Sequence, residues 1–312
     1  MSEAAEVQGP LVGQSANAAA RGRSRLSRSR QRAGILFSLP VIVLTVLLLF
    51  LPIVQTFYYS FTSWDGITSI PVGLDNYQRL LSDPHFWRVL LNNILLLASI
   101  PAAILIPLFV AFLLNEHVAG WRFFRSAYFV NTAISWVVVG VVATRFFAAN
   151  GILNSFLAAI GLGGVKTDLL SGEYSAMLAV IITFIWSVFG TNTIIFITGM
   201  ATLDREVYEA AKVDGAGVWA TFFHVTIPML KRFIQFAFIL TLITAFTALF
   251  SVIFIMTMGG PGYGTTTLEF FVFQNAFKLI AFGYGAAIGV VLFAVVFVIS
   301  IGQLRFFRDS SD

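Results

Sequence analysis

Residues 33–64 read AGILFSLPVIVLTVLLLFLPIVQTFYYSFTSW and contain no Asp, Glu, Lys or Arg. A helix needs about 20 predominantly apolar residues to cross the hydrocarbon core of a bilayer, and this run is longer than that. An Arg-rich stretch precedes it, as in a signal peptide. However, the run is too long for the apolar region of a signal peptide, and no small-x-small cleavage site follows. The stretch therefore predicts a membrane anchor that is retained.

Further runs without these charged residues follow at 89–115, 126–144, 146–165, 174–203, 233–268 and 279–304. The run 146–165 is the weakest candidate, because it holds two Asn and four Gly around a short apolar core from Ile152 to Leu162. That core is too short to cross a bilayer. We expect it to form an amphipathic segment at the membrane surface.

The composition agrees with a membrane protein. Hydrophobic residues make up 58% of the 312-residue chain and charged residues 11%, whereas an ordinary soluble domain is about 25% charged. So few charges could not cover the surface of a soluble fold of this size. Disordered chains are poor in apolar residues, so disorder of the whole chain is excluded as well.

The basic residues predict how many runs span the membrane. Lys and Arg accumulate in cytoplasmic loops. With six spans and the N-terminus inside, 14 of the 19 basic residues are cytoplasmic, whereas a seventh span at 146–165 leaves 10 inside and 9 outside. We therefore predict an all-α polytopic membrane protein with both termini in the cytoplasm. The six expected transmembrane helices are 34–58, 90–114, 127–147, 176–199, 233–257 and 281–304.

The tail 1–33 is rich in Ala, Ser, Gly and Arg and has no apolar periodicity. It is expected to be a disordered, basic cytoplasmic tail that sets the topology of the domain 34–308. Binding of this tail to anionic lipid or nucleic acid is the alternative. The net charge of +4 is interpreted as a mark of orientation, so the expected partner is the lipid bilayer and not a nucleic acid.

The residues that usually carry chemistry are missing from the predicted spans. The chain has no Cys, and its three His are far apart in sequence, which argues against a metal site. No ionisable residue lies deep within a span, which argues against a proton-driven carrier and an intramembrane hydrolase. GGPGYGTTT (259–267) lacks the Lys of a phosphate-binding loop and is expected to be a turn after the fifth span. We expect no catalytic residue, metal or cofactor here, and any energy for transport would enter through a partner.

The longest inner loop, about residues 200–232, predicts a helical hairpin. Asp204 suits the N-cap of the helix REVYEAAKV, Gly215 and Gly217 end that helix, and a second helix would stop at Pro228.

The second helix of this loop has an apolar face formed by Trp219, Phe222, Phe223 and Thr226 at helical spacing. Two interpretations remain open. The face could pack against the protein's own helix ends or the lipid interface, or it could dock into a groove of a soluble partner. Glu209 beside the small residues Ala210 and Ala211 would suit docking, with close approach and one ion pair.

The segment EAAKVDGAGVWATFFHVTIP (209–228) resembles the EAA loop of binding-protein-dependent ABC importer permeases. That pattern is EAA, three residues, Gly, nine residues, then Ile-x-Leu-Pro. Glu209, Ala210, Ala211, Gly215 and Pro228 match it at the same spacing. Leu203-Asp204 stands where the family usually has Ile-Pro.

The resemblance covers roughly residues 35–308. GLDNYQRLLSDPHFWRVLLNN (73–93), FRSAYF (124–129), NGILNSFLAAIG (150–161) and IWSVFGTN (185–192) are similar to stretches around the second, third and fourth spans of such permeases. GGP (259–261) followed by TTTL, and FGYGAAI (282–288), resemble the subunit type of the maltose-transporter F and glycerol-phosphate-transporter A components.

The resemblance implies a type I ABC importer permease architecture in a bacterial or archaeal plasma membrane. It also implies a second permease subunit, two cytoplasmic ATPase subunits that bind ATP and Mg, and an extracytoplasmic solute-binding protein. The EAA loop, about residues 200–232, would couple the permease to the ATPase. The residues implied for this coupling are Glu209, Ala210, Ala211, Asp214, Gly215, Ala216, Phe222 and Pro228.

Spans poor in charge suit a neutral sugar or sugar-like solute, which hydroxyl groups, amide groups and aromatic faces bind. Candidates to line its path are Trp186, Asn192, Thr193, Thr241, Thr244 and Thr247. The alternative for the Thr residues is a bond to their own backbone or between helices. The competing classes are a self-sufficient secondary carrier and a membrane-embedded enzyme acting on lipid-linked substrates.

Overall fold

The computed structural model describes residues 33–115, 121–162, 164 and 168–308, in two compact units that divide after Tyr58. The first unit contains the helix that begins at Ala33, including a π-helical turn η1 (Val46–Phe50) and most of α2 (Leu51–Tyr59). No residue of this helix is buried, and it agrees with the span predicted at 34–58. The predicted tail lies outside the described residues except for Ala33.

The second unit begins with a short hairpin and is otherwise helical. Its elements are β1 (Thr62–Trp64), β2 (Ser69–Pro71), α3 (Asp75–Ser82), α4 (Pro84–Asn115), α5 (Trp121–Thr132), α6 (Trp136–Phe147), α7 (Ile152–Ala159), α8 (Glu173–Met200), α9 (Arg205–Val213), α10 (Val218–Thr221), η2 (Phe222–Thr226), α11 (Ile227–Met229), α12 (Lys231–Thr247), α13 (Leu249–Met256), α14 (Leu268–Phe273), η3 (Gln274–Lys278) and α15 (Phe282–Arg308). The predicted helical class is confirmed, with the hairpin as a small addition.

The hairpin is antiparallel, with Ser63 opposite Ile70. Its turn is closed by Asp65, whose carboxylate accepts hydrogen bonds from the backbone amides of Ile67 and Thr68. The Asn76 amide donates to the carbonyls of Ser60 and Thr62, at 2.9 Å each. These bonds attach the hairpin to α3.

Within the described residues, five helices are long and apolar enough to cross a membrane: Ala33–Tyr59, Pro84–Asn115, Trp136–Ala159, Glu173–Met200 and Phe282–Gln303. A sixth candidate is a pair, Val218–Met229 and Lys231–Thr247, bent by 76°. Four of the six predicted spans therefore correspond to long helices, and the third and fifth need correction.

The third span was predicted at 127–147, but the helix is interrupted there. α5 ends at Thr132, and Ser135 caps a new helix by accepting a hydrogen bond from the Val138 amide. The candidate span therefore begins at Trp136 and extends through α7 to Ala159. Taken by itself, the weak run 146–165 contributes only the eight residues of α7, too few to cross a bilayer.

The fifth span was predicted at 233–257 and is divided at Ala248 into α12 and α13. The hydroxyls of Thr244 and Thr247 donate to carbonyls four residues earlier in α12, at 2.7 and 2.8 Å. Such bonds bend helices, which accounts for a break directly after Thr247.

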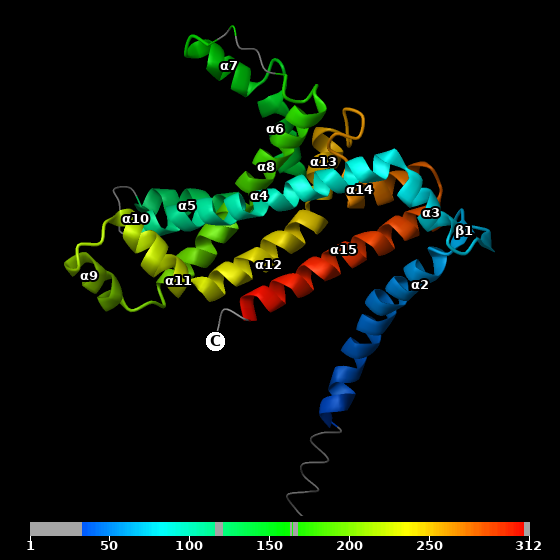
Figure 1. The fold of residues 1–312 in the computed structure, drawn as a ribbon, viewed down its shortest axis with the longest axis horizontal. Coiled ribbons are helices and arrows are strands. Elements are labelled where there is room, and N and C mark those ends of the chain that lie inside the picture. The colour runs from blue at the N-terminus through cyan, green and yellow to red at the C-terminus, as the bar shows by residue number, and fades with distance from the viewer. Residues whose placement is uncertain (1–32, 116–120, 163, 165–167, 309–312) are drawn as a thin grey trace, which may run out of the picture. The chain divides into compact units, whose positions relative to one another are not determined.

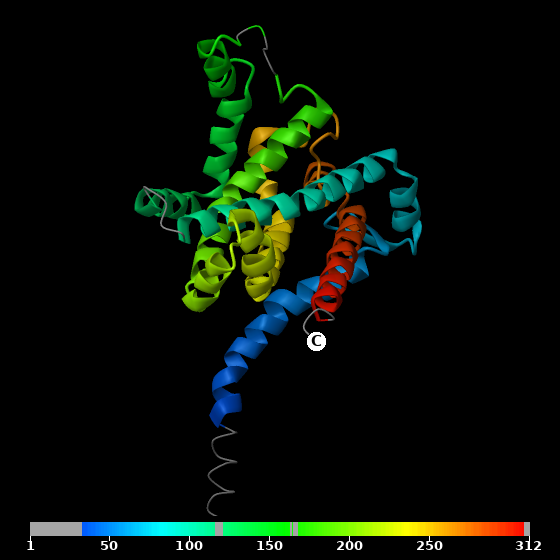
Figure 2. The same ribbon diagram turned by 60° about the vertical axis from the view of Figure 1, so that its left-hand side comes forward.

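Buried side chains of the second unit form three clusters along α4, and Figures 1 and 2 show this helix crossing the unit. One cluster joins α4 to α6, α8 and α13 around Phe184 and Ile253. Another joins α4 to α8, α12 and the EAA loop around Phe196 and Phe222. The third lies between α3, α4, α14 and α15. Helix α4 is therefore the common element of the core.

Candidate coupling loop and translocation path

The EAA loop folds as the predicted pair of helices joined at a glycine. Asp204 precedes α9 in an extended conformation, without a side-chain capping bond. At the other end, Gly215 has a φ of +78°, and the amide of Ala216 donates to the Ala211 carbonyl at 2.9 Å. This is the usual way to close a helix with a left-handed glycine.

The second helix of the loop extends from Val218 to Met229 and contains a π-helical turn, η2. The sequence predicted its end at Pro228, but the helix continues one residue further. The chain then bends by 76° into α12. The loop is thus joined directly to the fifth span.

The predicted apolar face of this second helix divides into two. Phe222 and Thr226 are buried, whereas Trp219 and Phe223 are 62% and 53% exposed. The wider π-helical turn rotates these side chains relative to a regular helix. Both Phe222 and Trp219 contact the ring of Phe109 in α4. Phe222 meets it edge-on at a centroid distance of 5.1 Å, and Trp219 stacks on it at 5.0 Å. Phe222, Thr226 and one face of the Trp219 ring therefore pack on the protein itself, while Phe223 and the rest of Trp219 are open.

The residues expected to couple the loop to an ATPase lie mostly at the surface. Glu209, Ala210, Asp214, Gly215 and Pro228 are exposed, Ala211 and Ala216 are half-buried, and Phe222 is buried beneath them. Val213, which the sequence did not single out, is 87% exposed at the tip of α9. An apolar tip beside an exposed carboxylate is a surface suited to a protein partner.

Three of the residues proposed to line a path are fully buried in this single chain. Asn192, Thr193 and Thr241 are 0–2% exposed. The Asn192 amide donates to the Ala103 carbonyl at 2.8 Å and to the Thr241 hydroxyl at 3.1 Å. The Thr193 hydroxyl donates to its own helix, at Phe189. Their described contacts are therefore with helices and not with open space.

The remaining candidates on the fifth span are more accessible. Thr247 is exposed and Thr244 half-buried, although both hydroxyls bond to their own helix. The sequence analysis left open that these Thr residues bond to their own backbone, and in the structure both of them do. Each hydroxyl oxygen can still accept a further hydrogen bond.

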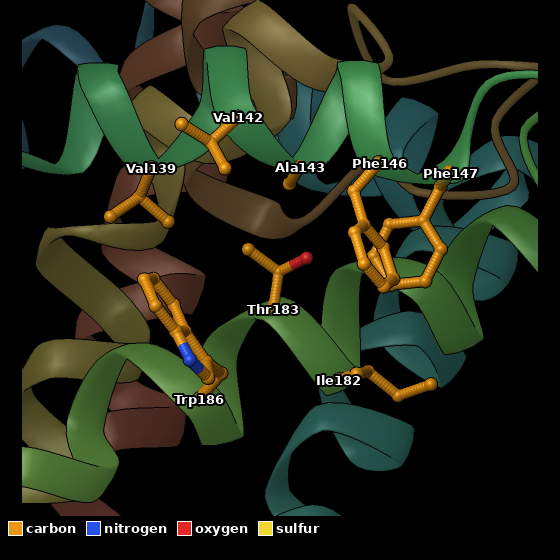
Figure 3. Close-up of a pocket in the computed structure, with 8 residues that line it drawn as sticks. All are labelled: Val139, Val142, Ala143, Phe146, Phe147, Ile182, Thr183 and Trp186. Carbon is orange, nitrogen blue, oxygen red and sulfur yellow. The ribbon is translucent and has the colours of Figure 1, made fainter. Parts of the chain in front are cut away.

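Trp186 lies at a pocket of about 320 Å³ between α6 and α8. Figure 3 shows its indole facing Val139 and Val142, with Phe146 and Phe147 along the same wall. The Thr183 hydroxyl at this pocket is already bonded to the Ala179 carbonyl. The pocket offers aromatic and aliphatic surface but few free hydrogen-bonding groups.

The segment 259–267 is a turn, as expected, and the structure shows that α4 holds it. The Asn92 amide donates to the carbonyls of Tyr263 and Thr266, at 2.7 and 2.9 Å, and Asn93 accepts from the Leu268 amide at 2.8 Å. Across the same region Arg88 pairs with Glu173 at 3.1 Å. These contacts connect the starts of α4 and α8 with the turn.

One acidic residue outside the candidate spans has a buried carboxyl group. Both carboxyl oxygens of Glu269 in α14 are shielded from solvent, and burial raises the pKa of this carboxyl to about 8. The backbone of Phe250 and the hydroxyl of Thr267 lower the pKa and offset part of that rise. Glu269 is therefore protonated over much of the neutral range.

Residues 86–309 match the family of binding-protein-dependent transport system inner membrane components. This range contains the EAA loop and every described helix from α5 to α15, and it begins two residues inside α4. The chain belongs to this family. It is a multi-pass membrane transport component with the type I importer permease fold, and serves as the translocation subunit of an importer. We refer to it below as the permease.

Individual relatives cover nearly the whole permease. A probable ABC transporter permease of Pyrococcus horikoshii is 34% identical over 86% of this chain and 94% of its own length. The multiple sugar-binding transport system permease protein MsmF of Streptococcus mutans is 32% identical over 87% and 94%. A chain in the crystal structure of a bacterial ABC transporter involved in import of the polysaccharide alginate has a TM-score of 0.78, at 20% identity, over 92% of this chain and 100% of its own.

Two features of the permease could not be found from the sequence. The contact of Asn192 with Ala103 joins residues 89 positions apart, and the burial of Glu269 depends on the packing of α13 and α14. The sequence signal for the contact of Asn192 with Ala103 was Pro107 inside the second span, which leaves the Ala103 carbonyl without its helical donor. No local pattern shows which side chain compensates for that proline.

Proposed function

We propose that the permease carries a carbohydrate across a bacterial or archaeal plasma membrane, driven by ATP hydrolysis on partner ATPase subunits. The observation that carries this proposal is the exposed hairpin of α9 and α10, with Gly215 in the left-handed conformation at the EAA spacing. This hairpin continues into α12, so a displacement of the hairpin by a partner would act on a candidate span.

The family name supports a solute-binding protein as a partner, since its members are components of binding-protein-dependent systems. The sugar-transport relative MsmF supports a carbohydrate as the cargo. A second permease subunit and two ATPases that bind ATP and Mg would complete the importer. The permease itself would bind no cofactor and perform no covalent chemistry.

The distribution of charge supports the orientation. Lys212, Lys231 and Arg232 lie within the EAA loop, and basic residues concentrate on the cytoplasmic side of membrane proteins. The loop would then face the compartment that holds ATP, with both termini on that side. A binding protein would deliver the sugar at the opposite face.

The test is to isolate the permease with its partners through an affinity tag and to reconstitute the complex in vesicles. We expect ATPase subunits to co-purify and ATP to drive uptake of at least one labelled sugar from a panel of mono- and oligosaccharides supplied with the binding protein. Uptake that needs no ATP and collapses with an ion gradient would instead identify a secondary carrier.

The same complex tests the role of Glu209. Glu209→Lys reverses the charge at the exposed surface of α9 and should lower both ATPase co-purification and ATP-driven uptake at least tenfold, the effect of losing about 1.4 kcal/mol of docking free energy. Glu206→Lys, on the first turn of the same helix, is the matched control. Equal retention of ATPase and uptake by both variants would refute coupling through Glu209.

A further inference from the structure

Proline occurs twice inside α4, at Pro101 and Pro107, although the helix is continuous from Pro84 to Asn115. In an α-helix the amide of each residue donates to the carbonyl four residues earlier. Proline has no amide hydrogen, so Pro107 leaves the carbonyl of Ala103 without its helical donor. Ala103 is 0% exposed, and water therefore cannot take the place of that donor.

A side chain from another helix supplies the missing donor. The amide nitrogen of Asn192 in α8 lies 2.8 Å from the Ala103 carbonyl oxygen. Asn192 is itself 1% exposed. This hydrogen bond replaces the one that Pro107 removes, and it can do so only while α4 and α8 keep their relative position.

The same amide group also reaches the fifth span. The Asn192 nitrogen donates to the Thr241 hydroxyl at 3.1 Å, and that hydroxyl lies 3.4 Å from the Asn192 carbonyl oxygen. Thr241 belongs to α12, which continues from the EAA loop through the 76° bend. The side-chain amide of Asn192 in α8 therefore donates one hydrogen bond to α4 and one to α12, and so links the three helices.

We propose that Asn192 is a positioning residue: it completes the backbone hydrogen bonding of α4 at Pro107 and links that helix to α8 and α12, so that displacement of the EAA loop moves the three helices together. The transport part of this inference rests on the proposed function, whereas the hydrogen-bond part does not. Asn192 thus serves helix coupling, while its contact with cargo stays a prediction from the sequence.

A double-mutant cycle on the full-length permease in detergent tests the hydrogen bond. Asn192→Leu leaves the Ala103 carbonyl unpaired and should lower the thermal unfolding midpoint by about 2–4 °C or more. Pro107→Ala restores a backbone amide to that carbonyl. In the Pro107→Ala background, Asn192→Leu should therefore cost less than half as much.

Pro101 provides the control for this cycle. It removes the donor to the Leu97 carbonyl and not to the Ala103 carbonyl that Asn192 meets, so Pro101→Ala should not reduce the effect of Asn192→Leu. Equal effects of Asn192→Leu in the wild-type and Pro107→Ala backgrounds would overturn the proposal. If Asn192→Leu does not fold, Asn192→Ser, whose side chain is too short to reach Ala103, takes its place in the same cycle.

The positioning role is tested in the assembled transporter. Because the chain has no Cys, spin labels can be attached at Ile106→Cys on α4 and at Phe297→Cys on α15, which lies outside the three linked helices; both side chains are about half exposed. ATP with vanadate should change the distance between the labels when Asn192 is present, and this change should be lost in Asn192→Leu at a temperature where the variant remains folded.

The outcomes separate this inference from the proposed function. A full distance change in Asn192→Leu would overturn the positioning role. No ATP-dependent change in the parent protein would refute coupling through the EAA loop, while the stability cycle would still decide whether Asn192 compensates for Pro107.

Discussion

Gly215 shows how a single residue shapes the surface offered to a partner. Its φ of +78° lies in the left-handed region, and a Cβ built there meets no atom within 4 Å. Space is therefore no obstacle to a larger residue, and the obstacle is the backbone conformation, which costs about 1–2 kcal/mol for a residue with a side chain. The turn between α9 and α10 depends on this one position.

We predict that Gly215→Val disrupts the turn and lowers ATP-driven uptake by about tenfold, the equivalent of about 1.4 kcal/mol, with a smaller loss for Gly215→Asn because Asn tolerates the left-handed region better. Gly217→Val is the matched control, since Gly217 also has no atom within 4 Å of a built Cβ but has a φ of −71°. Equal losses for Gly215→Val and Gly217→Val would show that backbone conformation is not the reason.

Glu269 makes stability depend on pH. Its pKa rises from 4.5 to about 8 on folding, so between these values the folded chain keeps a proton that the unfolded chain releases. Stability therefore falls as pH rises through this window, by up to about 1.4 kcal/mol per pH unit. Glu269→Gln keeps the neutral shape and removes the titration.

We expect the thermal midpoint of the wild type in detergent to decline from pH 5 to pH 8 more steeply than that of Glu269→Gln, with the gap widening as pH rises. Glu206→Gln, at the start of α9, should keep the wild-type slope. Parallel curves for wild type and Glu269→Gln would contradict the burial of a neutral carboxyl.

At the scale of elements, the permease uses interrupted helices at positions that the sequence presented as uniform apolar runs. Ser135 starts α6 within the predicted third span, and the Thr side chains before Ala248 end α12 within the predicted fifth. Each break exposes backbone groups that need partners. Buried polar side chains on α4 and α8 meet the same need at Pro107 and at the turn 259–267.

The contact between α4 and the turn 259–267 gives a prediction of its own. Asn92→Leu removes a donor to two carbonyls, those of Tyr263 and Thr266. The Tyr263 carbonyl still accepts from the Thr266 amide at 3.3 Å, so the expected loss is about 1–3 kcal/mol, the cost of one buried carbonyl left unpaired. Backbone amides of 259–268 should then exchange hydrogen for deuterium faster, as measured by mass spectrometry.

Asn154→Leu is the control for this experiment. Its amide also donates to two carbonyls, those of Ala148 and Ala149, but both are local and the residue is half-buried. We expect a smaller loss of stability and no change of exchange at 259–268. Unaltered exchange in Asn92→Leu would show that α4 does not hold the turn.

For the whole molecule, orientation in the membrane can be tested with single cysteines, because the chain contains none. Ile67 in the hairpin and Val213 at the tip of α9 are 93% and 87% exposed. In intact cells an impermeant maleimide should label Ile67→Cys, and it should label Val213→Cys only after permeabilisation. The reverse pattern would invert the proposed topology.

Much of this architecture was predictable from the sequence, because the free energy of transferring a helix into a bilayer is a sum over its own residues. That sum located the first, fourth and sixth spans to within three residues of their ends, and the second to within six. The helix–glycine–helix form of the EAA loop was predictable for a similar reason, since capping and left-handed turns are local. The third and fifth spans were less accurate because hydroxyl side chains that bond to the backbone interrupt helices within apolar runs while changing the hydropathy of the run little.

By itself, then, the sequence determined the membrane class, most of the spans and the family to which the permease belongs. Only the tertiary structure decided the surroundings of individual polar groups. Asn192, Thr193 and Thr241 carry groups that could line a path, yet helix packing buries them, and Asn192 meets a carbonyl that Pro107 left unpaired 89 positions away. A hydrogen bond between distant helices depends on how those helices pack, and that packing is not a sum over local residues.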